Sequence, residues 1–255
     1  MKRLLLLFVA SLAGCAQLIP APEAVVPERA AAETAWARVL ERHVDDRGRV
    51  DFAALERDRG DLDRYVSWVY AVGPNNRPEA FAGRAEILAY HLNAYNALAM
   101  YSVLAAGVPR SISEYGKLRF FWLRRMKVGG EPISLYRYEN EVIRPLGEER
   151  VHFALNCMAV HCPRLPRQPF RAATLEADLA REARQFLNEA RNVQVDPLRR
   201  VVRLSEIFDF FPEDFLAKAP SLLEYVNRHR AAPVPAGYAV EFIPYDWTVA
   251  AQSGS

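Results

Sequence analysis

The stretch from Glu79 to Ala106 constrains the fold more than any other part of the chain, because it is rich in Ala, Leu and Tyr and its helical pattern is apolar on every side. Such a helix has no polar face to turn toward solvent, so we expect it to be central and surrounded by other elements. Asn93 and Asn96 lie three residues apart on it, at neighbouring positions of its surface. Two amides in so apolar a helix need hydrogen-bond partners, and we expect them to organise the core or to serve a catalytic site.

The rest of the chain alternates helical patterns with turn-forming residues. We expect helices over residues 33–43, 52–69, 136–144, 174–191 and 205–210, hairpins over 125–135 and 193–204, and a late strand over 239–243. Gly129 and Gly130 supply the positive φ that the first hairpin turn requires. Residues 150–157 fit a buried helix or a strand equally well. The sum predicts a single α+β domain, mostly helical, with small antiparallel β elements.

The globular part is expected over residues 34–248, which is long enough for one well-packed domain, followed by a tail over 249–255. Positive and negative charges are mixed along the chain and the formal net charge is +2. No basic block stands apart from acidic neighbours, so nucleic acid is not an expected partner. The sequence indicates no cofactor, and it does not identify a protein or small-molecule partner.

The first fifteen residues have a basic start, an apolar stretch and then Leu12-Ala13-Gly14-Cys15. This pattern resembles a bacterial lipoprotein signal peptide over residues 1–14, cut before a cysteine that carries lipid. It predicts a membrane partner through a lipid anchor at Cys15, a flexible tether over residues 15–33, and a place in the cell envelope. Ala16 after the cysteine favours the outer membrane, with the domain facing the periplasm. The alternative is an ordinary secretory signal, in which case Cys15 is lost.

Several separated strings resemble the bacterial and plant family catalogued as domain of unknown function 547. They run from Trp36 to Trp247 and comprise Gly48 to Phe52, Leu92 to Leu98, Ser134 to Glu139, Ile143-Arg144, Arg150 to Cys157, Cys162-Pro163, Phe208 to Phe215 and Pro244 to Trp247. The resemblance implies a fold and a set of candidate residues but no substrate. The chain departs from the family pattern at His91, where Trp is usual, and at Asn140, where His is frequent.

A thiol nucleophile needs a cysteine, a histidine that takes its proton and a group that orients the histidine. Cys157 is the first candidate, because it ends an apolar element. His152 or His161 could be the base, with His91 a further candidate, and Glu139, Asn93 or Asn96 could orient it, as in the Cys-His-Asn arrangement of papain-like enzymes. His152 and Cys157 are five residues apart, so they can touch only if the element between them is broken. A papain-like architecture is therefore one candidate for the fold.

Other readings of the same residues remain open. In an oxidising compartment, Cys157 and Cys162 could instead form a disulfide across a short loop, or both could be buried and inert. Together with His152 and His161 they offer four metal-binding groups, but the spacing fits no usual zinc pattern, so we expect no metal site. Glu139 could be a surface carboxylate that pairs with Arg137 or Arg144.

The function expected from these observations is that of a lipid-anchored envelope protein that acts as a thiol-dependent hydrolase or acyl transferase. The alternative is a non-catalytic binding or assembly module with structural cysteines. Convergence of Cys157, a histidine and Glu139 or an asparagine on one open pocket would favour the enzyme, whereas scatter or full burial would favour the module.

Overall fold

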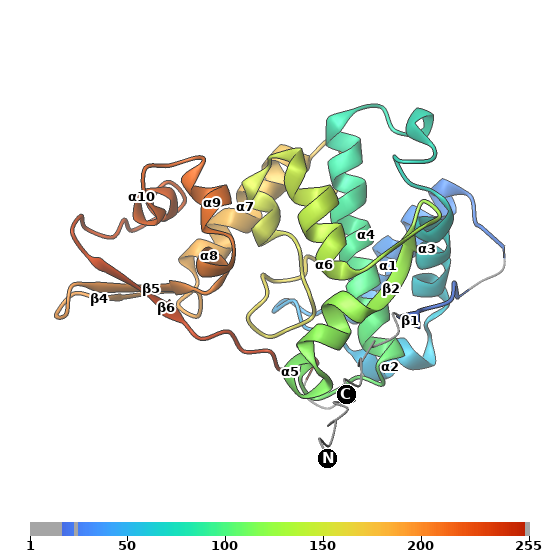
Figure 1. The fold of residues 1–255 in the computed structure, drawn as a ribbon, viewed down its shortest axis with the longest axis horizontal. Helices are drawn as coiled ribbons and strands as arrows, with labels where there is room; N and C mark the ends of the chain where they lie inside the picture. Colours follow the sequence, from blue (N-terminus) through green and yellow to red (C-terminus); the bar gives the residue numbers. More distant parts are fainter. Residues whose placement is uncertain (1–16, 23–24, 253–255) are drawn as a thin grey trace, which may run out of the picture.

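Helix α4, Arg84–Ala105, runs through the middle of the larger part of the molecule in the computed structural model (Figure 1). Helix α3, Gly60–Ala71, packs along one side of it, and α1, Arg29–His43, packs on α3. The short helix α6, Leu135–Arg137, contacts α4 from another side. Residues Leu88 to Leu104 of α4 are all buried, so the expected central helix is confirmed.

The structure describes residues 17–22 and 25–252, and the predicted α+β class is confirmed for this part of the chain. The remaining helices are α2 Phe52–Arg57, α5 Ile112–Tyr115, α7 Leu175–Asn188, α8 Ile207–Phe210, α9 Pro212–Leu216 and α10 Leu222–Asn227. The strands are β1 Gln17–Leu18, β2 Arg124–Val128, β3 Glu131–Ile133, β4 Val193–Asp196, β5 Val201–Ser205 and β6 Ala239–Ile243. Short 3-10 or π turns cover Pro78–Ala80, Arg119–Leu123, Tyr138–Ile143, Arg144–Leu146 and Glu149–Phe153.

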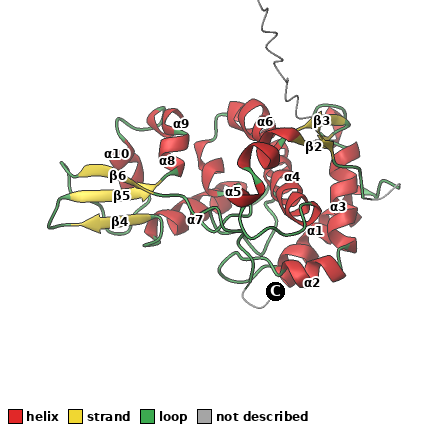
Figure 2. Cartoon of the chain, turned by 60° about the horizontal axis from the view of Figure 1, so that its bottom comes forward, coloured by secondary structure: helices red, strands yellow, loops and turns green. Residues whose placement is uncertain are grey.

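The strands form two separate three-stranded sheets. The order is β1-β2-β3 in the first, and β4-β5-β6 in the second, which lies at the far end of the molecule beside α8, α9 and α10 (Figure 2). The two predicted hairpins, β2-β3 and β4-β5, are confirmed as antiparallel pairs. Each sheet also contains a parallel pair that the sequence did not predict, because β1 runs parallel to β2 and β6 runs parallel to β5. Three helices separate β5 from β6 and bring the chain back to the same end of the sheet.

Several predicted helices have different bounds in the structure. The helix expected over 33–43 starts at Arg29, and the one expected over 136–144 is the short α6 followed by a π turn. The segment 52–69 is two helices rather than one, since Asp58 leaves helical geometry and α3 starts at Gly60. The central helix starts at Arg84 rather than at residue 79, because Gly83 has a φ of 130°, which a helix cannot contain. The ambiguous segment 150–157 is neither a long helix nor a strand, but a 3-10 turn over Glu149–Phe153 followed by a loop.

Apolar side chains form two clusters. The larger surrounds α4, and the smaller contains Phe153 together with side chains of α7, β5 and the helices after it. Tyr245 packs against both clusters. No helix of the described residues is both long enough and apolar enough to cross a membrane.

Parts of the expected tether and of the expected tail pack against the domain where the structure describes them. In the expected tether, β1 pairs with β2, Ile19 is buried, and Tyr70 donates a hydrogen bond to the Ile19 carbonyl over 2.9 Å. In the expected tail, Ala250 is buried and joins the turn before α2 to residue Met158 through backbone hydrogen bonds. Cys15 and the predicted signal peptide lie outside the described residues.

The docked N-terminal segment can be tested with two neighbouring substitutions. Ile19→Asp should lower the free energy of unfolding by roughly 2 kcal/mol, because it removes a buried apolar side chain and places a charge in its site. Leu18→Asp is the matched control, since Leu18 is 46% exposed. Urea denaturation gives both values. Equal effects of the two variants would mean that the segment is a free tether in solution.

Candidate active site

A cavity of about 90 Å³ lies where the two apolar clusters meet. Four chemistry-bearing residues that the sequence singled out line it together: Glu139, His152, Cys157 and Cys162. The other lining residues are Tyr95, Phe121, Leu155, Pro163, Ile207, Phe210, Phe211, Tyr245 and Trp247. Chemically reactive groups therefore share one pocket with mostly aromatic walls.

The loop that carries both thiols is held by a buried amide of α4. Asn96 accepts a hydrogen bond from the Asn156 backbone N–H at 2.8 Å and donates one to the Ala154 carbonyl at 3.0 Å. Asn156 in turn accepts from the Met158 N–H and donates to the Pro163 carbonyl, which closes the loop on itself. These contacts make Asn96 a positioning residue, as the core-organising interpretation of this amide expects.

The two thiols are free and interact directly. The sulfur of Cys162 accepts the Cys157 backbone N–H at 3.1 Å and the Tyr245 hydroxyl at 3.2 Å. Burial alone would raise the pKa of Cys162, but these donors and the Cys157 thiol outweigh it and lower that pKa. The pKa of Cys157 is raised, because its thiol donates to Cys162, because it is buried, and because its ionisation would place a second negative charge beside the first.

The geometry therefore assigns different states to the two sulfurs. Cys162, only 3% exposed, is the member of the pair that ionises first, and the partly exposed Cys157 keeps its proton. The sequence favoured Cys157 as the activated thiol, and the hydrogen-bond pattern places the activation on its partner.

Glu139 lies on the π turn Tyr138–Ile143 with its side chain 16% exposed. Its Oε2 accepts a hydrogen bond from the Tyr95 hydroxyl at 3.2 Å, and its Oε1 is 3.9 Å from Nδ1 of His152. Burial raises the pKa of Glu139 although His152 and Tyr95 oppose the shift. It pairs with neither of the arginines suggested by the sequence, since Arg137 binds Glu141.

Both ring nitrogens of His152 face carboxylates. Nε2 is 2.7 Å from Oδ2 of Asp214, and Nδ1 faces Glu139. The imidazole stacks on the ring of Phe211 with centroids 4.2 Å apart, and its side chain is 1% exposed. His152 thus contacts an acid on each side, and the Cys-His pair that the sequence suggested is not assembled in this structure.

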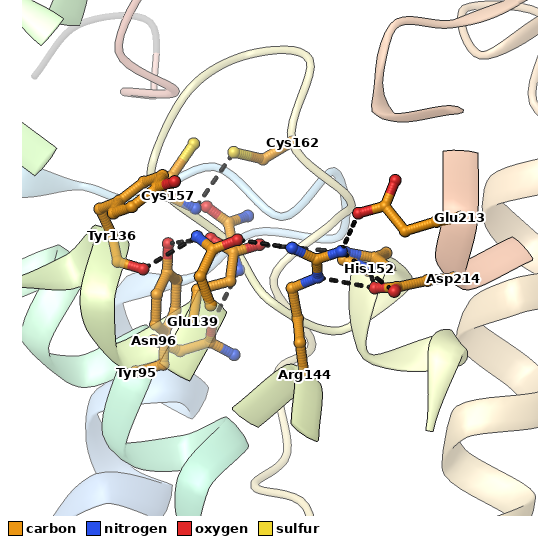
Figure 3. A network of polar contacts seen from close by, with 12 residues as sticks. Tyr95, Asn96, Tyr136, Glu139, Arg144, His152, Cys157, Cys162, Glu213 and Asp214 are labelled. Carbon is orange, nitrogen blue, oxygen red and sulfur yellow. Dashed lines mark hydrogen bonds and ion pairs between the residues drawn. The ribbon is translucent and has the colours of Figure 1, made fainter. Parts of the chain in front are cut away.

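Arg144 completes the polar network on the side away from the thiols (Figure 3). It binds Asp214 through Nε at 2.7 Å, pairs with Glu213, and lies over the ring of Phe211. Burial would raise the pKa of Asp214, but the hydrogen bonds from His152 and Arg144 lower it far below its usual range. Asn140, the position at which the family often has His, binds Arg144 through its side-chain oxygen at 2.6 Å.

Three other predicted candidates lie elsewhere. Asn93 binds the backbone of Phe170 through both ends of its amide and accepts from the indole of Trp36. His91 is buried against Tyr138, and desolvation lowers its pKa to about 4, so it stays neutral near pH 7. His161 accepts the Asp246 backbone N–H and lies edge-on to Tyr245 outside the cavity lining.

Sequence reasoning missed Asp214, Tyr95 and the contact between Tyr245 and the thiols. The closing Tyr245 to Trp247 string was expected to dock the C-terminal strand, and it also supplies two walls of the cavity. The pair Glu213-Asp214 inside an aromatic run was the available sign of a buried acidic site. Among residues 17–22 and 25–252, no group of three or more His, Cys, Asp or Glu side chains is placed to hold a metal ion.

The arrangement combines two interacting thiols, whose pKa values shift in opposite directions, with a carboxyl group whose pKa is raised by burial. These are the parts that nucleophilic catalysis at a carbonyl requires.

No curated protein and no solved structure is significantly similar to the chain. The family model described as "Protein of unknown function, DUF547" matches residues 79–187. This segment begins just before α4 and ends within the last turn of α7. The resemblance predicted from the sequence is confirmed over residues 79–187, where the chain matches this family.

Proposed function

We propose that the protein is a thiol-dependent hydrolase or acyl transferase. The observation that carries this proposal is the convergence of Cys157, Cys162, Glu139 and His152 on one cavity. Unrelated structural roles would not require four such groups, one from the π turn and three from the turn and loop after it, to share a lining. The family match names no activity for this domain, so the activity is part of the proposal.

In the first step, the Cys157 sulfur attacks the carbonyl carbon of the substrate, and its proton passes to the Cys162 thiolate with which it shares a hydrogen bond. Cys157 is the nucleophile because it is the less buried of the two cysteine residues. The protonated Glu139 gives its proton to the leaving group. An acyl thioester on Cys157, a neutral Cys162 and an ionised Glu139 result.

In the second step, Glu139 takes a proton from water or from an acceptor alcohol or amine, whose oxygen or nitrogen attacks the thioester carbon. Cys157 leaves and recovers its proton from Cys162. His152, held between Glu139 and the Arg144-bound Asp214, fixes the position of the carboxyl group and stabilises its ionised form. His152 is thus a positioning residue in this scheme.

The cavity limits the substrate. Its volume of about 90 Å³ corresponds to only a few water molecules, and aromatic rings of residues such as Phe121 and Trp247 form much of its wall. A short acyl group or the end of a longer chain fits such a space. We infer a peptide-like or small envelope substrate, since the sequence pattern at Cys15 favours a lipid-anchored protein at the outer membrane that faces the periplasm.

Titration of the thiols tests the shared proton. Cys162→Ala should lower the pH at which half of Cys157 reacts with iodoacetamide, because the neighbouring negative charge and the acceptor for its proton are gone. Cys157→Ala should shift Cys162 the opposite way, because the thiolate loses a donor. Peptide mass spectrometry of reduced protein gives both curves. Unchanged curves would mean that the thiols titrate independently, and the activation scheme would fail.

The acyl-enzyme can be sought directly. Reduced protein incubated with p-nitrophenyl acetate should release a burst of p-nitrophenol and carry an acetyl group on the Cys157 peptide, and Cys157→Ala should show neither. Acetylation of Cys162 alone, or of no cysteine in a protein that alkylating reagents still reach, would favour the non-catalytic binding or assembly module.

Glu139→Gln tests the acid–base role together with its pKa. An acid with a raised folded-state pKa loses stability as pH rises above the ordinary Glu value of about 4.3, because the unfolded chain ionises more easily. The variant lacks this loss, so its unfolding free energy relative to the native protein should rise between pH 4 and pH 7.

The thioester should also persist longer in Glu139→Gln, because the base for the second step is missing. Glu141→Gln is the matched control, since Glu141 is exposed and pairs with Arg137 on the same turn. Equal thioester lifetimes in the two variants would remove Glu139 from the mechanism.

A further inference from the structure

A second cavity, of about 160 Å³, lies on the other side of the thiol loop. Four arginines line it, Arg47, Arg49, Arg164 and Arg191, and no Asp or Glu is among its described lining residues. Four cations at one small cavity repel one another unless anions offset them. Among the described residues, the acid that pairs with these guanidinium groups is Glu189, which binds Arg164 and Arg191, so the four side chains keep a formal surplus of three positive charges over it.

Gly48 brings two of these arginines to the cavity. It has a φ of 74°, and a Cβ atom at this position would lie 2.5 Å from the Leu165 backbone nitrogen, so only glycine fits. The turn therefore packs directly against the loop that follows Cys162. This close contact explains the Gly48-Arg49 string, which the proposed catalytic site does not use.

The other two arginines are fixed in place. Arg191 donates to the carbonyls of Val160 and Cys162 and binds Glu189. Arg164 donates to the backbone of Asp46 and contacts Glu189 from the opposite side. A rigid pair of guanidinium groups is thus preorganised at the cavity.

The side chains of Arg47 and Arg49 are not held in this way. Neither side chain has a hydrogen bond or an ion pair with any described residue. Asp45 instead accepts their backbone N–H groups at 2.9 and 2.8 Å, and Asp46 pairs with Arg167. Two unpaired guanidinium groups beside two fixed ones can together offer several N–H donors to an oxyanion.

We propose that this cavity binds a phosphate group, held by Arg47 and Arg49 together with Arg164 and Arg191. Phosphate matches the surplus of positive charge and offers several oxygens to guanidinium forks. The site goes beyond the proposed catalytic function and does not depend on it. The two cavities share only Cys162 and Pro163 in their linings, so the anion would lie behind the thiol loop rather than among the catalytic groups.

Binding can be measured without any activity. Isothermal titration of the reduced protein with inorganic pyrophosphate should give saturable binding that weakens with added salt. Arg47→Ala and Arg49→Ala should each weaken it about tenfold, the effect of losing one charge-assisted contact. Arg199→Ala is the matched control, because Arg199 is an exposed arginine in the turn between β4 and β5, in the outlying sheet.

Vesicles of phosphatidylcholine with and without phosphatidic acid form a second arm, which separates a lipid headgroup from a free phosphate compound. Pyrophosphate binding or phosphatidic acid-dependent sedimentation, lost in Arg47→Ala and Arg49→Ala but kept in Arg199→Ala, supports the site and identifies the source. No binding in either arm overturns the proposal, as does binding that all three variants keep. Circular dichroism melting confirms that the variants are folded, and Arg49→Lys, which keeps the charge, should retain part of the affinity.

Discussion

The thiol loop depends on one buried amide of the central helix. Asn96 lies in a helix that is apolar on all sides, so its amide must find partners inside the protein, and it finds them in the backbone of Asn156 and Ala154. An irregular loop can be buried only if its backbone groups are paired, and a polar side chain on a buried helix can supply such pairing. The position of both sulfurs thus follows from the packing of α4.

The cavity owes its electrostatics to its place between two apolar clusters. Ionised groups are costly there unless they are paired, and the site divides its charges accordingly. Asp214 is ionised because Arg144 and His152 compensate it, whereas Glu139 has a hydroxyl and a more distant imidazole and so holds its proton more firmly. Two acids next to one histidine therefore have opposite pKa shifts. This separation lets one of them exchange a proton during a reaction while the other fixes the histidine.

Local pattern was sufficient for much of the fold. The apolar central helix, both hairpins and the amphipathic helix α7 follow from side-chain periodicity and turn chemistry, which act over a few residues. Parallel pairing of β1 and β6 could not be read in this way, because strand direction depends on the path of distant segments. For the same reason the docking of Ile19 was missed, since a short strand on an existing sheet edge needs few apolar residues of its own.

The candidate site was predictable as a set of residues but not as a set of contacts. Cys157, Cys162, His152 and Glu139 were named from residue type and from the family resemblance, and they line one cavity. Their partners Asp214 and Tyr245 come from parts of the chain about 60 and 88 residues further on, and no local pattern links them. The pKa of each thiol also depends on its hydrogen bond with Tyr245.

The same loop explains why two cavities of different character can lie so close together. Its carbonyls at Val160 and Cys162 accept hydrogen bonds from Arg191, while Asn96 pairs its earlier backbone groups from the opposite side. The thiols therefore face the acidic, aromatic cavity, and the carbonyl side faces the arginines. Because both sides supply hydrogen-bond partners for its backbone, the loop holds a fixed shape without regular secondary structure. Reactive sulfur can therefore be presented on a segment that is neither helix nor strand.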